Sequence, residues 1–147
     1  MSMQRIVTDK FIIEISDDNR EIKIRLTGAA AKREHDKALY KVVNQIWEDG
    51  VDRINADHIS LPFLDRSINL YRGDRRLDIV FYKGGRIYEC EVKTAREIGE
   101  DRTYTQLRDM CQRCQNFKVY IPKEQEKHFI ENLKLKGLSG VIRYDCY

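Results

Sequence analysis

Hydrophobic and polar residues alternate in two neighbouring runs, which flank the dipeptide Gly84-Gly85. Alternation with a period of two predicts a pair of β-strands. The two glycines predict a tight turn between them, because both central residues of a type I′ turn need positive φ. Once the turn is fixed, the pairing of the strands is fixed too. Counting outward pairs Ile79 with Cys90 and places Asp78 opposite Glu91, with Cβ atoms about 5 Å apart.

The two faces of this predicted hairpin differ in character. One face should pack on a core because its residues are apolar: Leu77, Ile79, Phe81, Tyr88, Cys90 and Val92. The other face carries Asp78, Glu91 and Lys93. Opposed carboxylates repel each other, and a shared proton, a cation or a nearby Lys or Arg relieves the repulsion. Of these remedies, a divalent cation such as Mg²⁺ is the one that could also take part in catalysis. Lys93 could then orient a water or offset charge on a phosphate.

A second interpretation of the same face needs no catalysis. Arg76 and Lys93 form the rung beyond Asp78 and Glu91. Diagonal salt bridges from Arg76 to Glu91 and from Lys93 to Asp78 would make a ladder on an exposed sheet. Such ladders are common and contribute little stability. The hairpin pattern by itself leaves both interpretations open.

The rest of the pattern predicts alternating strands and helices, and hence an α/β fold with a mixed sheet flanked by helices. The further predicted elements are strands 5–15 and 21–26, a helix 29–49, a strand 67–71, a helix 101–116, a strand 117–121, a helix 122–136 and a strand 141–144. Residues 51–65 give no clear pattern. Gly50 and Gly137 are expected to end the helices that precede them.

Composition narrows the class of protein. A length of 147 residues suits one domain, and a net charge of +3 means that nucleic-acid binding would need a local basic patch. No apolar run approaches the ~20 residues of a membrane span, and the start lacks the apolar core of a signal peptide. We therefore expect a cytoplasmic protein without a membrane partner. Cys111 and Cys114 share an apolar helical stripe, which favours buried thiols over a metal or redox pair.

Asp78 and Glu91-Val92-Lys93, joined by the hairpin, resemble the motif of the PD-(D/E)xK nuclease superfamily, which includes restriction-endonuclease-like, Holliday-junction-resolvase-like and RecB-like domains. The resemblance covers about residues 66–121, and Leu77 stands where the motif has Pro. It implies a restriction-endonuclease-like core of helix, three strands, helix and strand over about 29–121. Residues 1–28 would add an N-terminal hairpin, and 122–147 a C-terminal helix and strand.

The resemblance also implies a function. It is that of an endonuclease that hydrolyses DNA with Mg²⁺, or Mn²⁺ as a substitute, and small members of the superfamily often work as homodimers. Asp78, Glu91 and the Val92 carbonyl would be metal ligands, and Lys93 would position water or stabilise charge. A helix-borne acid often completes such sites, and Glu34 is the first candidate, with His35 and Glu48 as alternatives.

The helix after the hairpin adds further candidates. Gln106 resembles the glutamine of RecB-like nucleases that contacts phosphate or orients water. Residues expected to contact nucleic acid are Lys32, Arg33, Arg96, Arg102 and Tyr104. Two other functions stay open: a nucleic-acid-binding module of the same fold without cleavage, and a protein-interaction domain.

Overall fold

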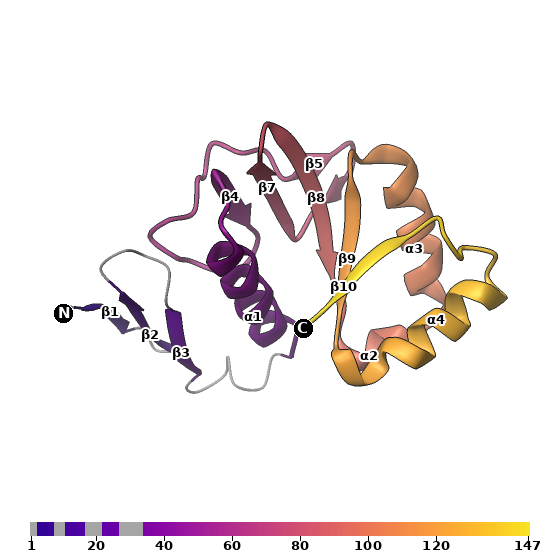
Figure 1. The fold of residues 1–147 in the computed structure, drawn as a ribbon, viewed down its shortest axis with the longest axis horizontal. Helices are drawn as coiled ribbons and strands as arrows, with labels where there is room; N and C mark the ends of the chain where they lie inside the picture. Colours follow the sequence, from indigo (N-terminus) through magenta and orange to yellow (C-terminus); the bar gives the residue numbers. More distant parts are fainter. Residues whose placement is uncertain (1–2, 8–10, 17–21, 27–33) are drawn as a thin grey trace.

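A mixed five-stranded sheet forms the centre of the molecule (Figure 1). The computed structural model describes residues 3–7, 11–16, 22–26 and 34–147. In spatial order the strands are β10 (Arg143–Cys146), β9 (Phe117–Ile121), β8 (Arg86–Val92), β7 (Ile79–Lys83) and β4 (Arg53–Ala56). Strands β4, β7 and β8 pair antiparallel, whereas β8, β9 and β10 pair parallel. The predicted α/β class with a mixed sheet is confirmed.

Helices cover both faces of this sheet. Helix α1 (Glu34–Asp49) packs on one face, and α3 (Asp101–Arg113) and α4 (Glu126–Leu135) pack on the other. Ile79, Phe81 and Cys90 point toward α1, as the apolar face of the hairpin predicts. Leu77 belongs instead to the opposite core with Val80. Because both faces are covered, the motif face is not an open sheet surface.

The predicted hairpin register is correct over the whole β7–β8 ladder. Ile79 pairs with Cys90, and the ladder runs from there to the turn. Gly84 and Gly85 have φ of 59° and 77°, as a type I′ turn requires. Asp78, however, lies just before β7 and outside the ladder. The rung expected between Arg76 and Lys93 does not form, because Arg76 pairs with Tyr71 in a separate two-stranded sheet.

The prediction of a strand over 67–71 is wrong. The strand that pairs with β7 at the edge of the sheet is β4. Of the predicted strand only Tyr71 is extended, in β5 (Tyr71–Arg72), which pairs with β6 (Arg75–Arg76). The sequence pattern does not predict strand β4, because the strand has only four residues and contains a buried Asn55. The Asn55 amide donates to Ile68 O at 2.9 Å and accepts from Arg66 at 3.0 Å, so a polar residue is tolerated in the core.

The first predicted strand is also wrong in its extent. Residues 5–15 are divided between β1 (Met3–Val7) and β2 (Phe11–Ser16), and β3 (Ile22–Leu26) follows. These strands form their own antiparallel sheet in the order β1-β2-β3, in place of the simple hairpin. The polar segment Thr8-Asp9-Lys10 between β1 and β2 explains the division, because it interrupts the apolar alternation.

Other boundaries differ by a few residues. The helix expected over 29–49 is described from Glu34 onward, and Gly50 follows it with φ of 89°. The helix expected over 101–116 ends at Arg113, and an unpredicted short helix α2 (Ala95–Ile98) precedes it. The last helix is preceded by one 3₁₀ turn, η2 (Lys123–Gln125), and the last strand begins at Arg143 rather than at 141.

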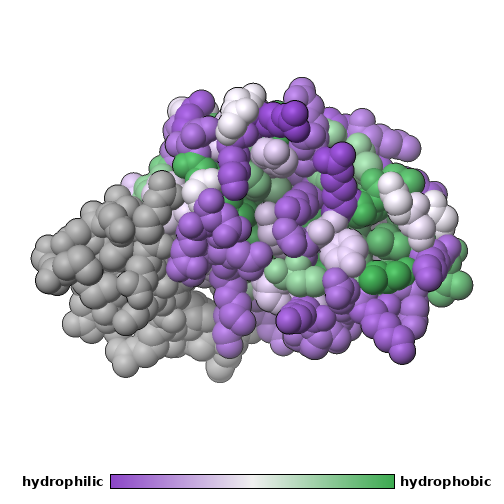
Figure 2. Space-filling model, viewed as in Figure 1, coloured by the Kyte–Doolittle hydropathy of each residue, from purple (hydrophilic) through white to green (hydrophobic). Residues whose placement is uncertain are grey.

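The described surface in Figure 2 is mostly hydrophilic, and apolar residues gather near the end of the molecule that α4 forms. None of the helices in the described ranges has the length and apolar character to cross a membrane.

Candidate functional site

Two acidic side chains meet where β7 begins and β8 ends. Asp78 is only 8% exposed. Its Oδ2 accepts a hydrogen bond from the Val92 backbone N–H at 2.8 Å. The Glu91 carboxyl lies close enough to Asp78 for each of the two side chains to shift the pKa of the other. The predicted proximity of the two carboxylates therefore holds, although Asp78 lies outside the strand ladder.

The two carboxyls have pKa values that are shifted in opposite directions. Burial raises the pKa of Asp78, but hydrogen bonds from His35, Glu91 and the Val92 N–H outweigh burial and hold that pKa below its ordinary value. Burial, followed by the negative charge of Asp78, raises the pKa of Glu91 well above its ordinary value. These opposite shifts favour a proton on Glu91 beside a charged Asp78, and a proton held in this way is one of the three remedies for opposed carboxylates.

His35 is the residue of α1 that reaches this pair. Its Nε2 lies 3.3 Å from Asp78 Oδ2, and this hydrogen bond raises the pKa of His35. Glu34, the first candidate for a helix-borne ligand, is exposed and lines a neighbouring cavity. Glu48 accepts from Asn44 at 3.4 Å near the other end of α1. The helical phase of His35, which it shares with the buried Leu39, is the sequence signal that singles it out.

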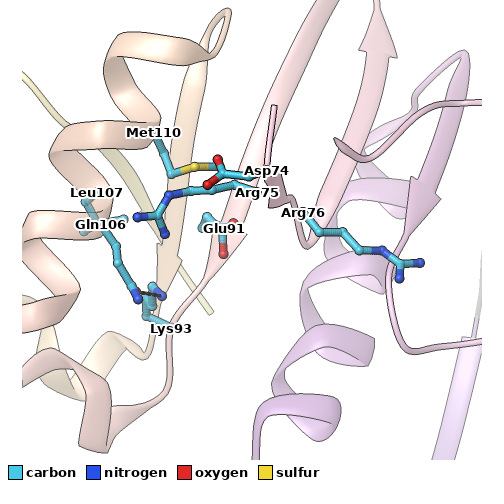
Figure 3. A pocket seen from close by; sticks show the side chains of 8 residues that line it. All are labelled: Asp74, Arg75, Arg76, Glu91, Lys93, Gln106, Leu107 and Met110. Atoms are coloured by element: carbon cyan, nitrogen blue, oxygen red, sulfur yellow. Dashed lines mark hydrogen bonds between the residues drawn. The ribbon is translucent and has the colours of Figure 1, made fainter. Parts of the chain in front are cut away.

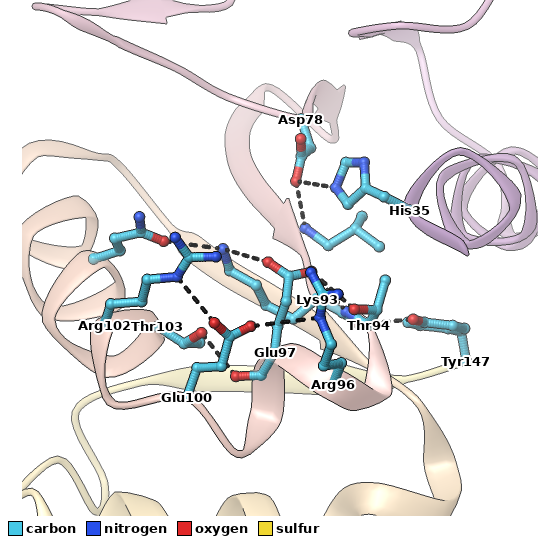
Figure 4. A network of polar contacts seen from close by, with 12 residues as sticks. His35, Asp78, Lys93, Thr94, Arg96, Glu97, Glu100, Arg102, Thr103 and Tyr147 are labelled. Carbon is cyan, nitrogen blue, oxygen red and sulfur yellow. Dashed lines mark hydrogen bonds and ion pairs between the residues drawn. The ribbon is translucent and has the colours of Figure 1, made fainter. Parts of the chain in front are cut away.

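Lys93 and Gln106 come together beside the carboxylates. Lys93 Nζ lies 3.3 Å from Gln106 Oε1 and 3.5 Å from Glu97 Oε2, and the residue is 7% exposed. Its backbone is fixed as well, because its N–H donates to Tyr120 O at 2.9 Å and its carbonyl accepts from the Tyr147 hydroxyl at 2.7 Å. Figure 4 shows this network around the end of β8.

Glu91, Lys93 and Gln106 line one cavity of about 290 Å³ (Figure 3). Its lining residues are Asp74, Arg75, Arg76, Glu91, Lys93, Gln106, Leu107 and Met110. The sequence pattern predicts no catalytic or binding role for Arg75 or Arg76. Their position directly before Leu77-Asp78 was the only signal available, since their partners Asp109 and Asp57 are remote in the sequence.

The diagonal salt-bridge ladder does not form. Arg76 Nη2 pairs with Asp57 Oδ1 at 2.9 Å, and Lys93 pairs with Glu97, so neither cation takes the diagonal partner that the ladder requires. The reason is that β6 leaves the line of β7 and pairs with β5 instead. The motif face is therefore a cavity wall with its own hydrogen bonds, not a solvated ladder.

The predicted nucleic-acid contacts are only partly brought together. Arg96 and Arg102 line a second cavity of about 890 Å³ with His35 and Glu34, and their side chains are 84% and 71% exposed. Tyr104, by contrast, is buried, and its hydroxyl donates to Ile98 O at 2.6 Å. The structure gives Tyr104 a packing role in place of the predicted contact.

Lys32 and Arg33, the other two basic residues predicted to contact nucleic acid, lie outside the described residues.

The cysteines are free thiols. Cys90 is buried, and Cys111, Cys114 and Cys146 are partly buried. Cys111 and Cys114 are therefore less buried than their predicted place on an apolar helical stripe implies. Burial raises the pKa of Cys114 to about 12, so this thiol is a poor nucleophile at neutral pH.

The donor set suits a hard divalent cation. Over residues 34–147 and the described N-terminal strands, no three His, Cys, Asp or Glu side chains gather into a group that could hold a metal by themselves. Mg²⁺ needs fewer protein ligands, because it keeps several waters and is commonly held by one or two carboxylates together with substrate phosphates. Asp78 and Glu91, with the adjacent Val92 carbonyl, fit that requirement, and a bound cation would replace a proton on the pair.

Comparison with known proteins yields no match from a family model, from a curated protein or from a solved structure.

Proposed function

We propose that the protein is a metal-dependent nuclease of the PD-(D/E)xK type, which hydrolyses phosphodiester bonds in DNA. The observation that supports this proposal is the acidic pair Asp78 and Glu91 where β7 begins and β8 ends, with Glu91 and Lys93 lining one cavity. The order of elements supports it. Helix α1, the antiparallel strands β4, β7 and β8, helix α3 and the parallel strand β9 follow the core order of that superfamily.

Asp78, Glu91 and the Val92 carbonyl would hold Mg²⁺. When bound, the ion would polarise the scissile phosphate and lower the pKa of a water molecule. Asp78 is kept charged and correctly oriented by His35 and by the Val92 N–H, which is the usual task of groups behind a metal ligand. Glu91 must give up its proton before it can contribute a charged ligand.

Lys93 supplies positive charge where the reacting phosphate becomes more negative. Its ammonium is held between Gln106 and Glu97, so little reorganisation is needed when the phosphate arrives. Gln106 acts on the substrate through Lys93 as a positioning residue. The water oxygen forms its bond to phosphorus while the bond to the leaving sugar oxygen breaks.

Exposed arginines would hold the rest of the strand. Arg96 and Arg102 extend from α2 and from the start of α3 beside the cavity that His35 lines. Contacts from such residues to phosphates fix the register of a nucleic acid without reading its bases. Two cuts in a duplex need two such sites, which a two-fold dimer would supply.

The test is cleavage of linear, nicked, flap and four-way-junction DNA with and without Mn²⁺. We expect Mn²⁺-dependent products from the natural protein. Asp78→Asn, Glu91→Gln and Lys93→Met should each slow cleavage by about 100-fold or more, because charge stabilisation of this kind contributes about that much. Asp145→Asn is the matched control, since that carboxylate lies on β10 and pairs with Lys118 outside the cavity.

Cleavage at natural rates by all three site variants would contradict the proposal. Circular dichroism and a thermal unfolding curve establish that each variant is folded, so that a loss of activity reports on the site.

A further inference from the structure

A short hairpin beside the cavity presents an exposed aromatic ring. It consists of β5 and β6 joined by Gly73-Asp74, and three of its residues line the cavity that contains Glu91 and Lys93. Tyr71 on β5 remains 53% exposed. Isolated exposed aromatic residues are common, so exposure alone assigns no role. The surroundings of this ring distinguish it.

The hairpin is fastened to the core at several points. Arg72 pairs with Glu89, which is buried in β8. Arg75 Nε lies 2.6 Å from Asp109 Oδ2, and Arg113 reaches back from α3 to Asp74 at 3.1 Å. The ring of Tyr71 is thereby carried on a fixed support, which reduces the ordering that binding a ligand would require.

An arginine is held against the ring. The guanidinium carbon of Arg76 lies 5.3 Å from the centroid of the Tyr71 ring. The same guanidinium is anchored to Asp57, a buried residue just after β4, at 2.9 Å. The backbone N–H of Asp57 in turn donates to Asp78 O at 2.8 Å. A continuous chain of contacts therefore runs from the exposed ring to the backbone of the metal-ligand candidate Asp78.

We infer that Tyr71 and Arg76 form a stacking site for an unpaired base next to the scissile phosphate. This rests on the proposed function and narrows its substrate class to DNA that has single-stranded or branched segments. Every base has a π-face that stacks on an aromatic ring or on a guanidinium plane, so the site tolerates any sequence. Bases inside a duplex stack on one another and offer no free face to the hairpin.

Figure 3 shows how the two arginines of β6 divide their tasks. Arg75 extends along the cavity toward the side of Gln106 and Leu107, whereas the side chain of Arg76, which also lines the cavity, extends in the opposite direction. Arg75 is therefore placed to face a phosphate in the cavity, and Arg76 to face the base that follows it.

The experiment compares two DNAs of the same sequence, one fully duplex and one with a single-stranded flap. Each contains 2-aminopurine at the branch position, and binding is followed in Ca²⁺ by anisotropy and by quenching of the 2-aminopurine fluorescence. We expect Tyr71→Ala to weaken flap binding by about tenfold, in keeping with the usual effect of removing one base–aromatic stack, and to abolish the quenching. Duplex binding should change by less than about twofold. Tyr71→Phe should keep both signals.

Tyr82→Leu is the matched control, because Tyr82 also has an arginine over its ring, Arg53 at 5.1 Å, but belongs to β7 and not to the β5–β6 hairpin. Arg76→Met is a second variant that should weaken flap binding while leaving the tyrosine in place. Unfolding curves of each variant exclude loss of the fold.

Equal weakening of flap and duplex by Tyr71→Ala, or no effect on either, would overturn the stacking site. If the natural protein cuts DNA in Mn²⁺ and the tyrosine variants behave like it, only this inference fails. If the natural protein neither binds DNA in Ca²⁺ nor cuts it in Mn²⁺, the proposed function fails and the stacking site with it.

Discussion

The raised pKa of Glu91 links the stability of the fold to pH. Glu91 has an ordinary pKa of 4.5 when unfolded and a much higher one in the folded protein. Between those two values the folded state keeps a proton that the unfolded state has released. The contribution of Glu91 to stability is therefore fully present below pH 4.5. It is lost as the pH rises toward the folded pKa, by up to about 1.4 kcal/mol for each pH unit.

Glu91→Gln should remove this loss. We expect the free energy of unfolding of the natural protein to fall between pH 5 and pH 8, and that of the variant to fall less. His35 also has a raised pKa and contributes a loss of the same sign, but it does so in both proteins. Urea denaturation at several pH values measures the difference. Parallel pH profiles would show that Glu91 is not protonated in the folded state.

The proximity of the candidate site residues was largely predictable from the sequence. Asp78 and Glu91 were predictable because a two-glycine turn fixes the register of both flanking strands. Lys93 was predicted from its place on the same face of the hairpin, whereas Gln106 followed only from the family resemblance, and the structure places the two in contact. The partnership of Arg76 with Asp57 was not predictable, since it depends on where the short strand β4 enters the sheet.

The β7–β8 turn sets the register of the two strands that position Asp78 and Glu91. Gly84 and Gly85 both adopt positive φ, and no heavy atom lies within 4 Å of where a Cβ would be added to either. A side chain there would therefore meet backbone strain and no clash. Left-handed backbone costs about 1–2 kcal/mol for most residues, and Asn tolerates it better.

We expect Gly84→Ala to lower the free energy of unfolding by about 1 kcal/mol and Gly84→Asn to lower it by less than half of that. The two variants occupy the same position and differ mainly in their preference for the left-handed region. Chemical denaturation of both proteins provides the comparison. Equal losses would mean that the turn is not of the type I′ geometry that sets the register.

Elements with a strong local signal were predictable, and those that depend on distant contacts were not. The hairpin, α1 and β9 carry long or regular patterns. Strand β4 has four residues with a polar one buried among them, and Asn55 is stabilised there by Arg66 and by Ile68 O, which no local pattern reveals. The N-terminal strands were predicted as strands, but their number depends on a short polar break.

On the scale of the whole protein, a small net charge of +3 means that nucleic-acid binding must come from a local surface. Arg96 and Arg102 are the described basic residues most exposed beside the site. Contacts to phosphates release counterions, so affinity should fall linearly with salt on logarithmic axes.

Arg102→Ala should weaken binding to all DNA sequences about equally and reduce the salt slope by about one. Binding in Ca²⁺ over a range of salt concentrations measures both quantities. Lys134→Ala, which removes an exposed charge on α4 that lines neither cavity, should leave the slope unchanged. A change in sequence preference with Arg102→Ala, without a change in slope, would point to base readout at this position.

Titration with Mn²⁺ tests the central claim most directly, because it examines the carboxylate pair without any substrate. Calorimetry at pH 7 in two buffers of different ionisation enthalpy reports both binding and proton release. We expect the natural protein and Asp145→Asn to bind Mn²⁺ and to release a proton as the ion replaces the one on Glu91. Asp78→Asn and Glu91→Gln should lose that binding. Undiminished Mn²⁺ binding by both of these variants would contradict the assignment of the metal site to Asp78 and Glu91.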